Sequence, residues 1–316
     1  MSEKATPGRI RVLRPTEVER ALPMDLAIAA TRELLVARKK GELVSGQRSG
    51  IEVGATGLIW TPGGHAPTKR IGLRLYLTNV PEDDQVVALW DTLSGELQGL
   101  ALGAAFGAIR TGAIGGVAID VLARKDSRVL AVIGLGSQAR RQVEACLVVR
   151  PIEQVRLYRR SQAELAAAAD QLAARWGVGV VACSSAEQAV RTADIVVTAT
   201  SSIHPVLEAS WLAPGTHLSV LGPKWQSGAE VALDAVSQAD VILSDFPEQF
   251  RAEAHFMLAS RPEGERMGDL ADHLDGGRHH ALERTCFLSH GLSGTEPWLL
   301  DAALKEAERL SIGQLV

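Results

Sequence analysis

Hydrophobic residues recur at helical spacing near the start of the chain and at strand spacing soon after it. Residues 15–40 carry apolar side chains every three or four positions, which predicts two short helices with Pro23 at the start of the second. Residues 55–64 and 70–80 alternate or cluster strand-forming residues. Residues 85–103 predict a hairpin with TLSGE as its turn. These elements indicate a first domain of mixed helix and strand.

The pattern changes after residue 103. Residues 104–123 read as a helix of small residues that another element can approach closely. Beyond residue 128, short apolar strands alternate with amphipathic helices, which predicts a parallel sheet covered on both faces. The fold class is therefore α/β: a doubly wound parallel sheet in residues 122–291, with a second, smaller α+β domain made of residues 1–121 and 292–316.

Composition limits the kinds of partner. The chain has 316 residues, 46% of them hydrophobic, and a net charge of −4, so neither nucleic acid nor an anionic membrane is expected to bind. The first residues are polar, unlike a signal peptide, and the apolar run at 99–109 is too short to span a bilayer. The three cysteines lie far apart and form no CxxC. We expect a cytoplasmic protein with reduced thiols.

The segment RVLAVIGLGSQARRQ runs from an apolar strand through a glycine-bearing turn into a helix. Gly134 permits the tight turn, Gly136 lets the backbone approach a pyrophosphate, and the small Ala139 lets the helix pack on the strand. The helix N-terminus at Ser137 and Gln138 presents free N–H groups to phosphate. Glycine pairs in such turns are often structural, but this one opens a βαβ repeat, so it predicts a dinucleotide site.

The end of the next strand indicates which dinucleotide binds. NAD sites usually carry an acidic residue there, to bond the ribose 2′-hydroxyl. This chain instead has Arg159, Arg160 and Ser161, and guanidinium groups suit a 2′-phosphate. The alternative is a solvated basic strand end. We favour NADP(H), with NAD(H) possible.

The stretch AAFGAIRTGAIGGVAIDVLARKDSRVLAVIGLGSQARRQ resembles the ornithine cyclodeaminase and μ-crystallin family. The segments PTEVERALPMDLAIAATRELL and TCFLSHGLSGTEPWLLDAALKEA are similar to that family's two ends. The resemblance implies a Rossmann-type domain joined to a smaller domain that carries substrate contacts and forms a homodimer. It also implies hydride transfer between a nicotinamide nucleotide and the α-carbon of an amino or imino acid.

The resemblance also suggests site residues. Arg48 and Arg110 match two arginines that hold the substrate carboxylate in the family, and a bidentate clamp of this kind would orient the α-carbon. Taken alone, Arg48 reads as an ordinary loop arginine. Thr111 is expected near the cofactor, and Thr198 and Thr200 beside the nucleotide, although both could be plain strand residues.

Two further segments are assigned to the nucleotide by the same resemblance. One contains Gly222, and the other contains His290 and Gly291. For His290, packing or helix capping is the competing interpretation. No metal site is predicted, because His279 and His280 lack a third ligand at helical or finger spacing.

Three positions depart from the family pattern. Arg74 stands where the family has a lysine, Lys224 where it has an aspartate, and Glu296 where it has another acidic residue. Arginine is a poor general acid, so Arg74 is expected to orient substrate or stabilise negative charge. Lys224 would repel a second ammonium group and would favour a substrate with an acidic distal group. Both are retained as candidate catalytic residues.

These departures disfavour ornithine cyclodeamination and favour a simpler reaction. Hydride transfer to an already protonated imine needs little beyond a carboxylate clamp, a cofactor and orientation. We therefore expect an NAD(P)H-dependent oxidoreductase that acts on a small imino, keto or amino acid. An ornithine cyclodeaminase with altered catalytic groups, and an NADPH-binding protein without catalysis, remain the alternatives.

Overall fold

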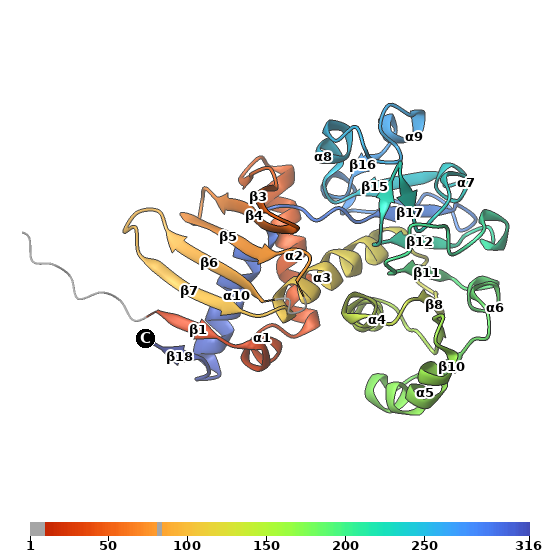
Figure 1. The fold of residues 1–316 in the computed structure, drawn as a ribbon, viewed down its shortest axis with the longest axis horizontal. Helices are drawn as coiled ribbons and strands as arrows, with labels where there is room; N and C mark the ends of the chain where they lie inside the picture. The colour runs from red at the N-terminus through yellow and green to blue at the C-terminus, as the bar shows by residue number, and fades with distance from the viewer. Residues whose placement is uncertain (1–9, 81–83) are drawn as a thin grey trace, which may run out of the picture. The chain divides into compact units, whose positions relative to one another are not determined.

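The computed structural model describes residues 10–80 and 84–316 and divides into two compact units (Figure 1). Unit 1 contains Met1–Arg110 and Leu292–Val316, and unit 2 contains Thr111–Gly291. The division between the units falls inside helix α3 (Ala105–Leu122), because the second half of α3 packs into the core of unit 2. The predicted domain boundaries, after residues 121 and 291, stay a prediction, and the expectation about a signal peptide lies outside the described residues.

Unit 1 is built on a mostly antiparallel sheet with the strand order β18-β1-β7-β6-β5-β4-β2, in which β3 also pairs with β4. Its strands are β1 (Arg11–Leu13), β2 (Leu43–Ser45), β3 (Ser49–Val53), β4 (Thr56–His65), β5 (Arg70–Leu77), β6 (Gln85–Asp91), β7 (Leu97–Leu102) and β18 (Gln314–Leu315). Its helices are α1 (Pro15–Ala21), α2 (Met24–Lys39) and α10 (Thr295–Arg309). The expected helix pair and the hairpin of β6 and β7 are confirmed. The short strands β1, β2 and β3 were not predicted.

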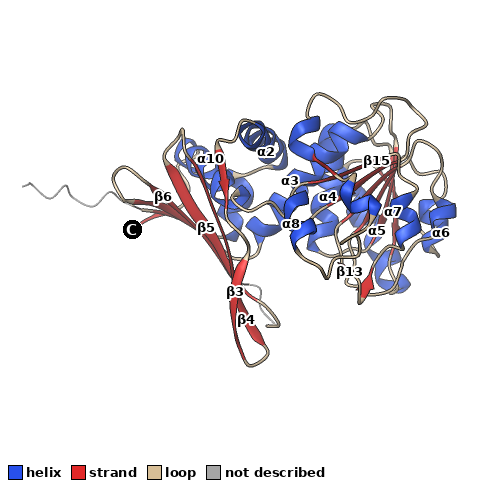
Figure 2. Ribbon diagram, turned by 90° about the horizontal axis from the view of Figure 1, so that it is seen from above, coloured by secondary structure: helices blue, strands red, loops and turns tan. Residues whose placement is uncertain are grey.

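Helix α10 packs on one face of this sheet, beside α2 (Figure 2). Strand β5 turns Arg70, Gly72 and Arg74 toward α10, since alternate residues share a face. A Cβ atom on Gly72 would lie 2.9 Å from the Cβ of Pro297, so a larger residue there would push the helix away. Gly72 therefore leaves room for α10 between the side chains of Arg70 and Arg74.

Unit 2 is a parallel sheet with the order β10-β9-β8-β11-β12-β17-β15-β16, and a two-stranded ribbon of β13 and β14. Its strands are β8 (Val129–Ile133), β9 (Gln154–Tyr158), β10 (Gly179–Ala182), β11 (Ile195–Thr198), β12 (His217–Val220), β13 (Lys224–Trp225), β14 (Gly228–Ala229), β15 (Val241–Ser244), β16 (Gly268–Asp269) and β17 (Thr285–Leu288). Its helices after α3 are α4 (Ser137–Val149), α5 (Gln162–Trp176), α6 (Ala186–Val190), α7 (Leu233–Ser237), α8 (Pro247–Ala252) and α9 (Pro262–Glu265), with short 3₁₀ turns at Ala209–Trp211 and Leu270–His273. The doubly wound α/β fold class is thus confirmed. The strand order reverses between β8 and β11, which is where such sheets bind ligands.

The strands of unit 2 are apolar on both sides because helices cover both faces. In β8, Leu130 and Val132 join a core with α3, α4 and α5. The alternate residues Ala131 and Ile133 join a second core with α6 and α7. Burial on both faces explains why these strands read as continuous apolar runs.

Helix α3 is longer than the apolar run considered from the sequence. Its 18 residues have a mean hydropathy of 1.4, enough by length and composition to cross a membrane. However, 83% of this segment is buried within the protein, which is typical of a core helix. Its small residues let α4 approach closely: a Cβ atom on Gly115 would lie 2.1 Å from Oε1 of Gln142.

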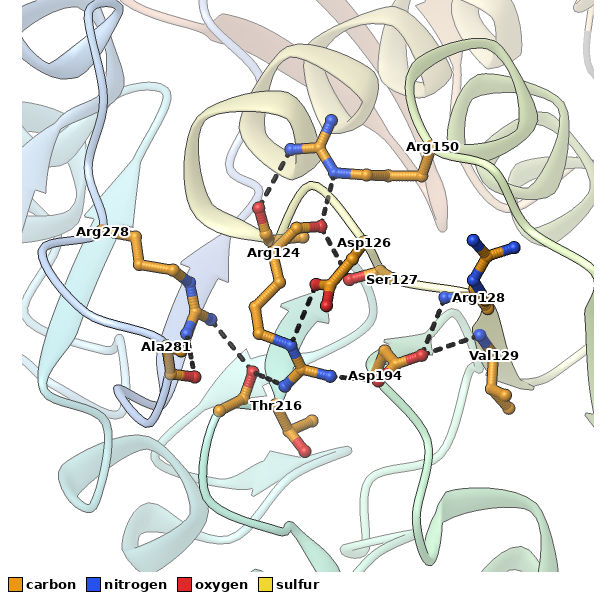
Figure 3. A network of polar contacts seen from close by, with 12 residues as sticks. Arg124, Asp126, Ser127, Arg128, Val129, Arg150, Asp194, Thr216, Arg278 and Ala281 are labelled. Atoms are coloured by element: carbon orange, nitrogen blue, oxygen red, sulfur yellow. Dashed lines mark hydrogen bonds and ion pairs between the residues drawn. The ribbon is translucent and has the colours of Figure 1, made fainter.

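A polar network at the amino ends of β8, β11 and β12 ties the end of α3 to the sheet (Figure 3). The Arg150 side chain, only 1% exposed, donates to the carbonyls of Ile119 (2.9 Å), Asp120 (2.7 Å) and Ala123 (3.0 Å). These carbonyls belong to the last turn of α3 and the residue after it, where the helix leaves acceptors without internal partners. Arg150 therefore caps the helix with a positive charge at its negative end.

Candidate functional site

The glycine turn after β8 has the geometry that a pyrophosphate requires. Gly134 has a φ of +109°, and a Cβ atom there would lie 2.3 Å from the carbonyl oxygen of Ala199. Gly136 precedes α4 as its N-cap, and a Cβ atom there would meet nothing within 4 Å. The N-cap residue Gly136 has no side chain that could cap α4, so the amides of Ser137 and Gln138 lie at an uncapped helix N-terminus. The turn therefore combines open space with unshared N–H donors.

A cavity of about 630 Å³ lies at this turn. It is formed by residues that follow β8, β9 and β11, at the point where the strand order reverses. Its lining residues are Ile133, Gly134, Leu135, Gly136, Tyr158, Arg159, Arg160, Ser161, Ala199, Thr200, Ser201, Ser202 and Val206. These described lining residues include two arginines and no carboxylate. Ala139, the third position of the motif, is fully buried in the core behind the turn.

The hydroxyls of Thr198 and Thr200 are both used by a buried carboxylate, Glu230. Each donates to a Glu230 oxygen at 2.9 Å, and the Thr200 amide donates at 2.9 Å. The amides of Leu221 and Gly222 donate to the same side chain. Glu230 is fully buried and joins the carboxyl ends of β11 and β12.

The predicted site residues near Glu230 differ in their position relative to the cavity. Thr200 lines the cavity, whereas Thr198 lies behind it. Gly222 does not line the described cavity; a Cβ atom there would lie 2.4 Å from Glu230, so the glycine admits this carboxylate. Sequence reasoning missed Glu230, because a single glutamate in GAEVALDAV carries no local signal.

His290 and Gly291 are held by another buried acid. Their amides donate to the two oxygens of Asp245 at 2.7 and 2.8 Å. The His290 ring packs against Phe250 and Phe256, with ring centroids 4.6 Å apart in both pairs. This geometry supports the packing interpretation for His290. Neither residue lines the cavity described above.

Thr111 and Lys224 also lie away from the lining of this cavity. The Thr111 carbonyl accepts from Nε2 of Gln142 at 2.8 Å. Lys224 is 5% exposed, and its Nζ donates to the carbonyls of Leu221 (3.0 Å) and Gly222 (2.6 Å). Two backbone acceptors thus hold the ammonium group that was expected to act on a substrate.

Unit 1 contains a buried cluster of two arginines around one glutamate. Nε of Arg110 donates to Oε1 of Glu296 at 2.8 Å, and Nη1 of Arg74 donates to the same oxygen at 3.4 Å. Nε of Arg74 also donates to Oε1 of Gln85 at 2.7 Å, and its guanidinium lies 4.2 Å from the ring centroid of Tyr76. The two arginines are less than a tenth exposed and Glu296 is fully buried.

The charges of this cluster do not balance. Burial raises the pKa of Glu296, but Arg110 and then Arg74 lower it, and the net result lies below its ordinary value. Burial, more than any neighbour, lowers the pKa of Arg74. Two guanidinium groups against one carboxylate leave one positive charge. No described residue accepts a hydrogen bond from the terminal nitrogens of Arg110, so the cluster is suited to an anion.

Arg48 lies between β2 and β3 and is half-buried. It is close enough to lower the pKa of both Arg74 and Glu296. The structure therefore brings Arg48, Arg74 and Arg110 to one region of unit 1. Glu296 joins them from α10. In the sequence, only its position in the C-terminal segment that resembles the family indicated this residue.

Three comparisons with known proteins give consistent results for the family and the fold of this chain. The model of the ornithine cyclodeaminase/mu-crystallin family matches residues 76–296. A Rhizobium meliloti protein with a provisional dehydrogenase name is 34% identical over 213 residues, 65% of each chain. This match covers slightly less than two thirds of that relative's length.

Two further similarities concern one enzyme class. Delta(1)-pyrroline-2-carboxylate reductase of Bacillus cereus is 31% identical over 239 residues, covering 71% of this chain and 73% of the relative. The solved structure of the Thermococcus litoralis enzyme of that name, in complex with NADH and L-proline, has a TM-score of 0.86. The match covers 97% of this chain and 100% of the Thermococcus litoralis chain. Because the two sequences are 24% identical, this similarity shows the fold alone.

Proposed function

Because this chain belongs to the ornithine cyclodeaminase/mu-crystallin family, we propose that it is a nicotinamide-dependent oxidoreductase acting at the α-carbon of an imino, keto or amino acid. The observation that carries the proposal is the buried cluster of Arg74, Arg110 and Glu296 with its one excess positive charge. An anion held there by Arg110 would be fixed in orientation by two parallel N–H donors.

The substrate carboxylate is the anion that we assign to this cluster, with Arg110 and Arg48 as its ligands. Glu296 holds the Nε side of Arg110, which leaves the terminal nitrogens for the carboxylate. Arg74 adds positive charge and, as an arginine, neither gives nor takes a proton at neutral pH. The reaction must therefore suit a substrate that needs no proton from Arg74, such as an already protonated imine.

The nucleotide belongs, in this proposal, to the cavity at the glycine turn of unit 2. When bound, the nicotinamide nucleotide supplies or accepts the hydride. The free N-terminus of α4 would hold its pyrophosphate, and the open space at Gly136 would admit it. Lys224 keeps only an indirect role, since its ammonium group is bound by backbone carbonyls.

NADP(H) is the proposed form of the cofactor, although the Thermococcus litoralis enzyme binds NADH. Arg159 and Arg160 line the cavity, and its described lining contains no carboxylate for a ribose 2′-hydroxyl. Replacing either arginine by alanine should raise the Kd for NADPH about tenfold and change the Kd for NADH less than about twofold. Arg175→Ala, at an exposed arginine of α5 outside the cavity, is the matched control. Equal weakening of NADPH and NADH would contradict the 2′-phosphate assignment.

The substrate proposal is tested by NADPH oxidation against a panel of imino and keto acids. Δ1-pyrroline-2-carboxylate comes first, because the Bacillus cereus relative carries that activity in its name. Keto acids with ammonia follow, and ornithine with NAD is run in the deaminating direction. Turnover of an imine supports the reductase, whereas proline and ammonia from ornithine would establish a cyclodeaminase. Tight NADPH binding without any turnover would favour the non-catalytic alternative.

We also propose that the protein is a homodimer formed through the sheet face of unit 1 that α10 leaves uncovered. Cross-strand neighbours on this face are apolar: Trp60 pairs with Leu75, both partly buried, and the exposed Ile71 pairs with the partly buried Trp90. Such a continuous apolar face favours association with a second copy. Sedimentation velocity should give twice the monomer mass, and a monomer at micromolar concentration would overturn the proposal.

A cytoplasmic location is the last part of the proposal. It is supported by the three cysteines, which are buried and form no disulfide among the described residues. Burial raises the pKa of Cys146 and of Cys286 to about 12, so these thiols resist ionisation and behave as apolar side chains.

A further inference from the structure

Unit 1 contains a second cavity, of about 560 Å³, that the proposed function does not use. It lies among α2, α10 and the neighbouring ends of β4, β5 and β6. None of the residues of the arginine cluster lines it, and it shares no lining residue with the nucleotide cavity. Its size falls within the range of small-molecule sites.

Part of the cavity wall is apolar, with one aromatic corner. Seven apolar residues line it: Leu26, Ala29, Ala30, Leu43, Leu89, Pro297 and Ala302. Trp298 and His65 meet edge to face in the corner, with ring centroids 4.5 Å apart. Nδ1 of His65 contacts the Thr68 hydroxyl at 2.8 Å, whereas its buried Nε2 forms no hydrogen bond with any described residue. Small side chains on α2 and α10 thus leave space beside a polar ring.

The charges at the rim are matched except for one. Arg70 pairs with Asp91, which does not line the cavity, and more distantly with Asp301 at 3.3 Å. Asp301 accepts from Lys305 at 2.6 Å. Glu306 pairs with Arg309 at 2.6 Å. Glu33 on α2 lines the cavity as well, and it forms no ion pair with a described residue. The unmatched rim charge is therefore negative, which favours a cationic group beside an aromatic face.

The wall of the cavity is continuous with the arginine cluster. Gly294, Pro297 and Trp298 line the cavity, and Glu296 lies in the same turn of α10 but holds Arg74 and Arg110. This turn has little freedom toward β4, since a Cβ atom on Gly63 would lie 2.2 Å from Cα of Gly294. A molecule that displaces the turn must move Glu296 with it.

We propose that this cavity is a second ligand site, for a small molecule with an aromatic or branched apolar body and one protonated amine. Its occupancy changes the carboxylate affinity of the arginine cluster through the first turn of α10. The coupling rests on the proposed function of that cluster, whereas binding in the cavity does not. Reciprocity requires that the two ligands change each other's affinity by the same factor.

Calorimetry with three probes of one shape tests the ligand class. 1-Naphthylmethylamine should bind more tightly than 1-naphthylmethanol, and 1-naphthoic acid should bind most weakly. Glu33→Gln should raise the Kd of the amine about two- to fivefold, the size expected for an exposed ion pair. Glu308→Gln, at an exposed glutamate of α10 outside the cavity, is the control. Equal binding of the three probes would overturn the amine assignment, and absence of binding would overturn the site.

Location and coupling are tested with two further variants. Ala302→Phe should fill the cavity and abolish amine binding, while the Kd of NADPH stays unchanged. Arg110→Ala should keep amine binding but remove binding of L-proline, used as a carboxylate probe. Amine binding that survives Ala302→Phe would place the probe elsewhere and contradict the proposal. If wild-type protein binds both probes with no mutual effect, the coupling is wrong; if only L-proline fails to bind, the proposed function fails and the cavity site stands.

Discussion

Replacing Glu296 by glutamine removes the only negative charge from the buried cluster while keeping the shape of the side chain. In the wild type, one oxygen accepts from Arg110 at 2.8 Å and from Arg74 at 3.4 Å. The amide oxygen of glutamine can still accept a hydrogen bond. However, both guanidinium groups then remain buried without a counter-charge inside the cluster.

The expected cost follows from these distances. Opposite charges about 4 Å apart attract by about 4 kcal/mol at an effective dielectric constant of 20. Removing one partner of a buried pair typically costs about 3–5 kcal/mol, and the retained acceptor places Glu296→Gln at the lower end. We therefore expect the free energy of unfolding to fall by about 3 kcal/mol at pH 7.5.

Urea unfolding of the wild type and the variant measures this difference. Glu308→Gln, at an exposed position on the same helix, should change stability by less than about 0.5 kcal/mol. L-proline at saturating concentration should stabilise the Glu296→Gln protein more than the wild type, because its carboxylate then neutralises a larger excess charge. A loss below about 1 kcal/mol, or no extra stabilisation by the carboxylate, would refute the reasoning about the cluster.

The pH dependence has a defined sign. The pKa of Glu296 is lowered in the folded protein, so its contribution is present above the unfolded value of 4.5 and is lost as pH falls through the folded value. The difference between the wild type and Glu296→Gln should therefore narrow only below pH 4.5. A difference that narrows near neutral pH would place the titrating group elsewhere.

Three further changes test other parts of the structure. Arg150→Met removes the cap of α3 and should lower the free energy of unfolding by about 3 kcal/mol in urea; a loss below about 1 kcal/mol would argue against capping. Burial, followed by the charges of Arg278 and Arg150, lowers the pKa of His217 from 6.5 to about 3 in the folded protein. As the pH falls below 6.5, the His217 side chain is therefore protonated in the unfolded chain but not in the folded protein. Between pH 7.5 and 5 the wild type should lose about 2 kcal/mol that His217→Gln does not lose, and parallel pH profiles would contradict this. Glu230→Gln should raise the Kd of NADPH about tenfold, by freeing the Thr200 turn, and should leave L-proline binding unchanged; weakening of both ligands would indicate general misfolding.

The sequence alone determined the fold class and the place of the glycine turn after β8. Both follow from local patterns: alternation of short apolar strands with helices, and glycines at fixed offsets in one turn. The structure explains why a glycine stands at position 134. Its φ is positive, and a Cβ atom there would lie 2.3 Å from a backbone carbonyl oxygen. The resemblance to the family added arginines 48 and 110, which unit 1 brings near Arg74.

Only the tertiary structure decided which charges meet. Arg74 and Glu296 are separated by 222 positions in the chain, and the Thr198–Glu230 bond by 32, so no periodicity could connect them. Lys224 was expected to act on substrate from its aligned position, yet its ammonium group is held by two carbonyls beside it. Periodicity records which face of an element is buried, whereas the partner of a buried charge depends on how distant elements pack.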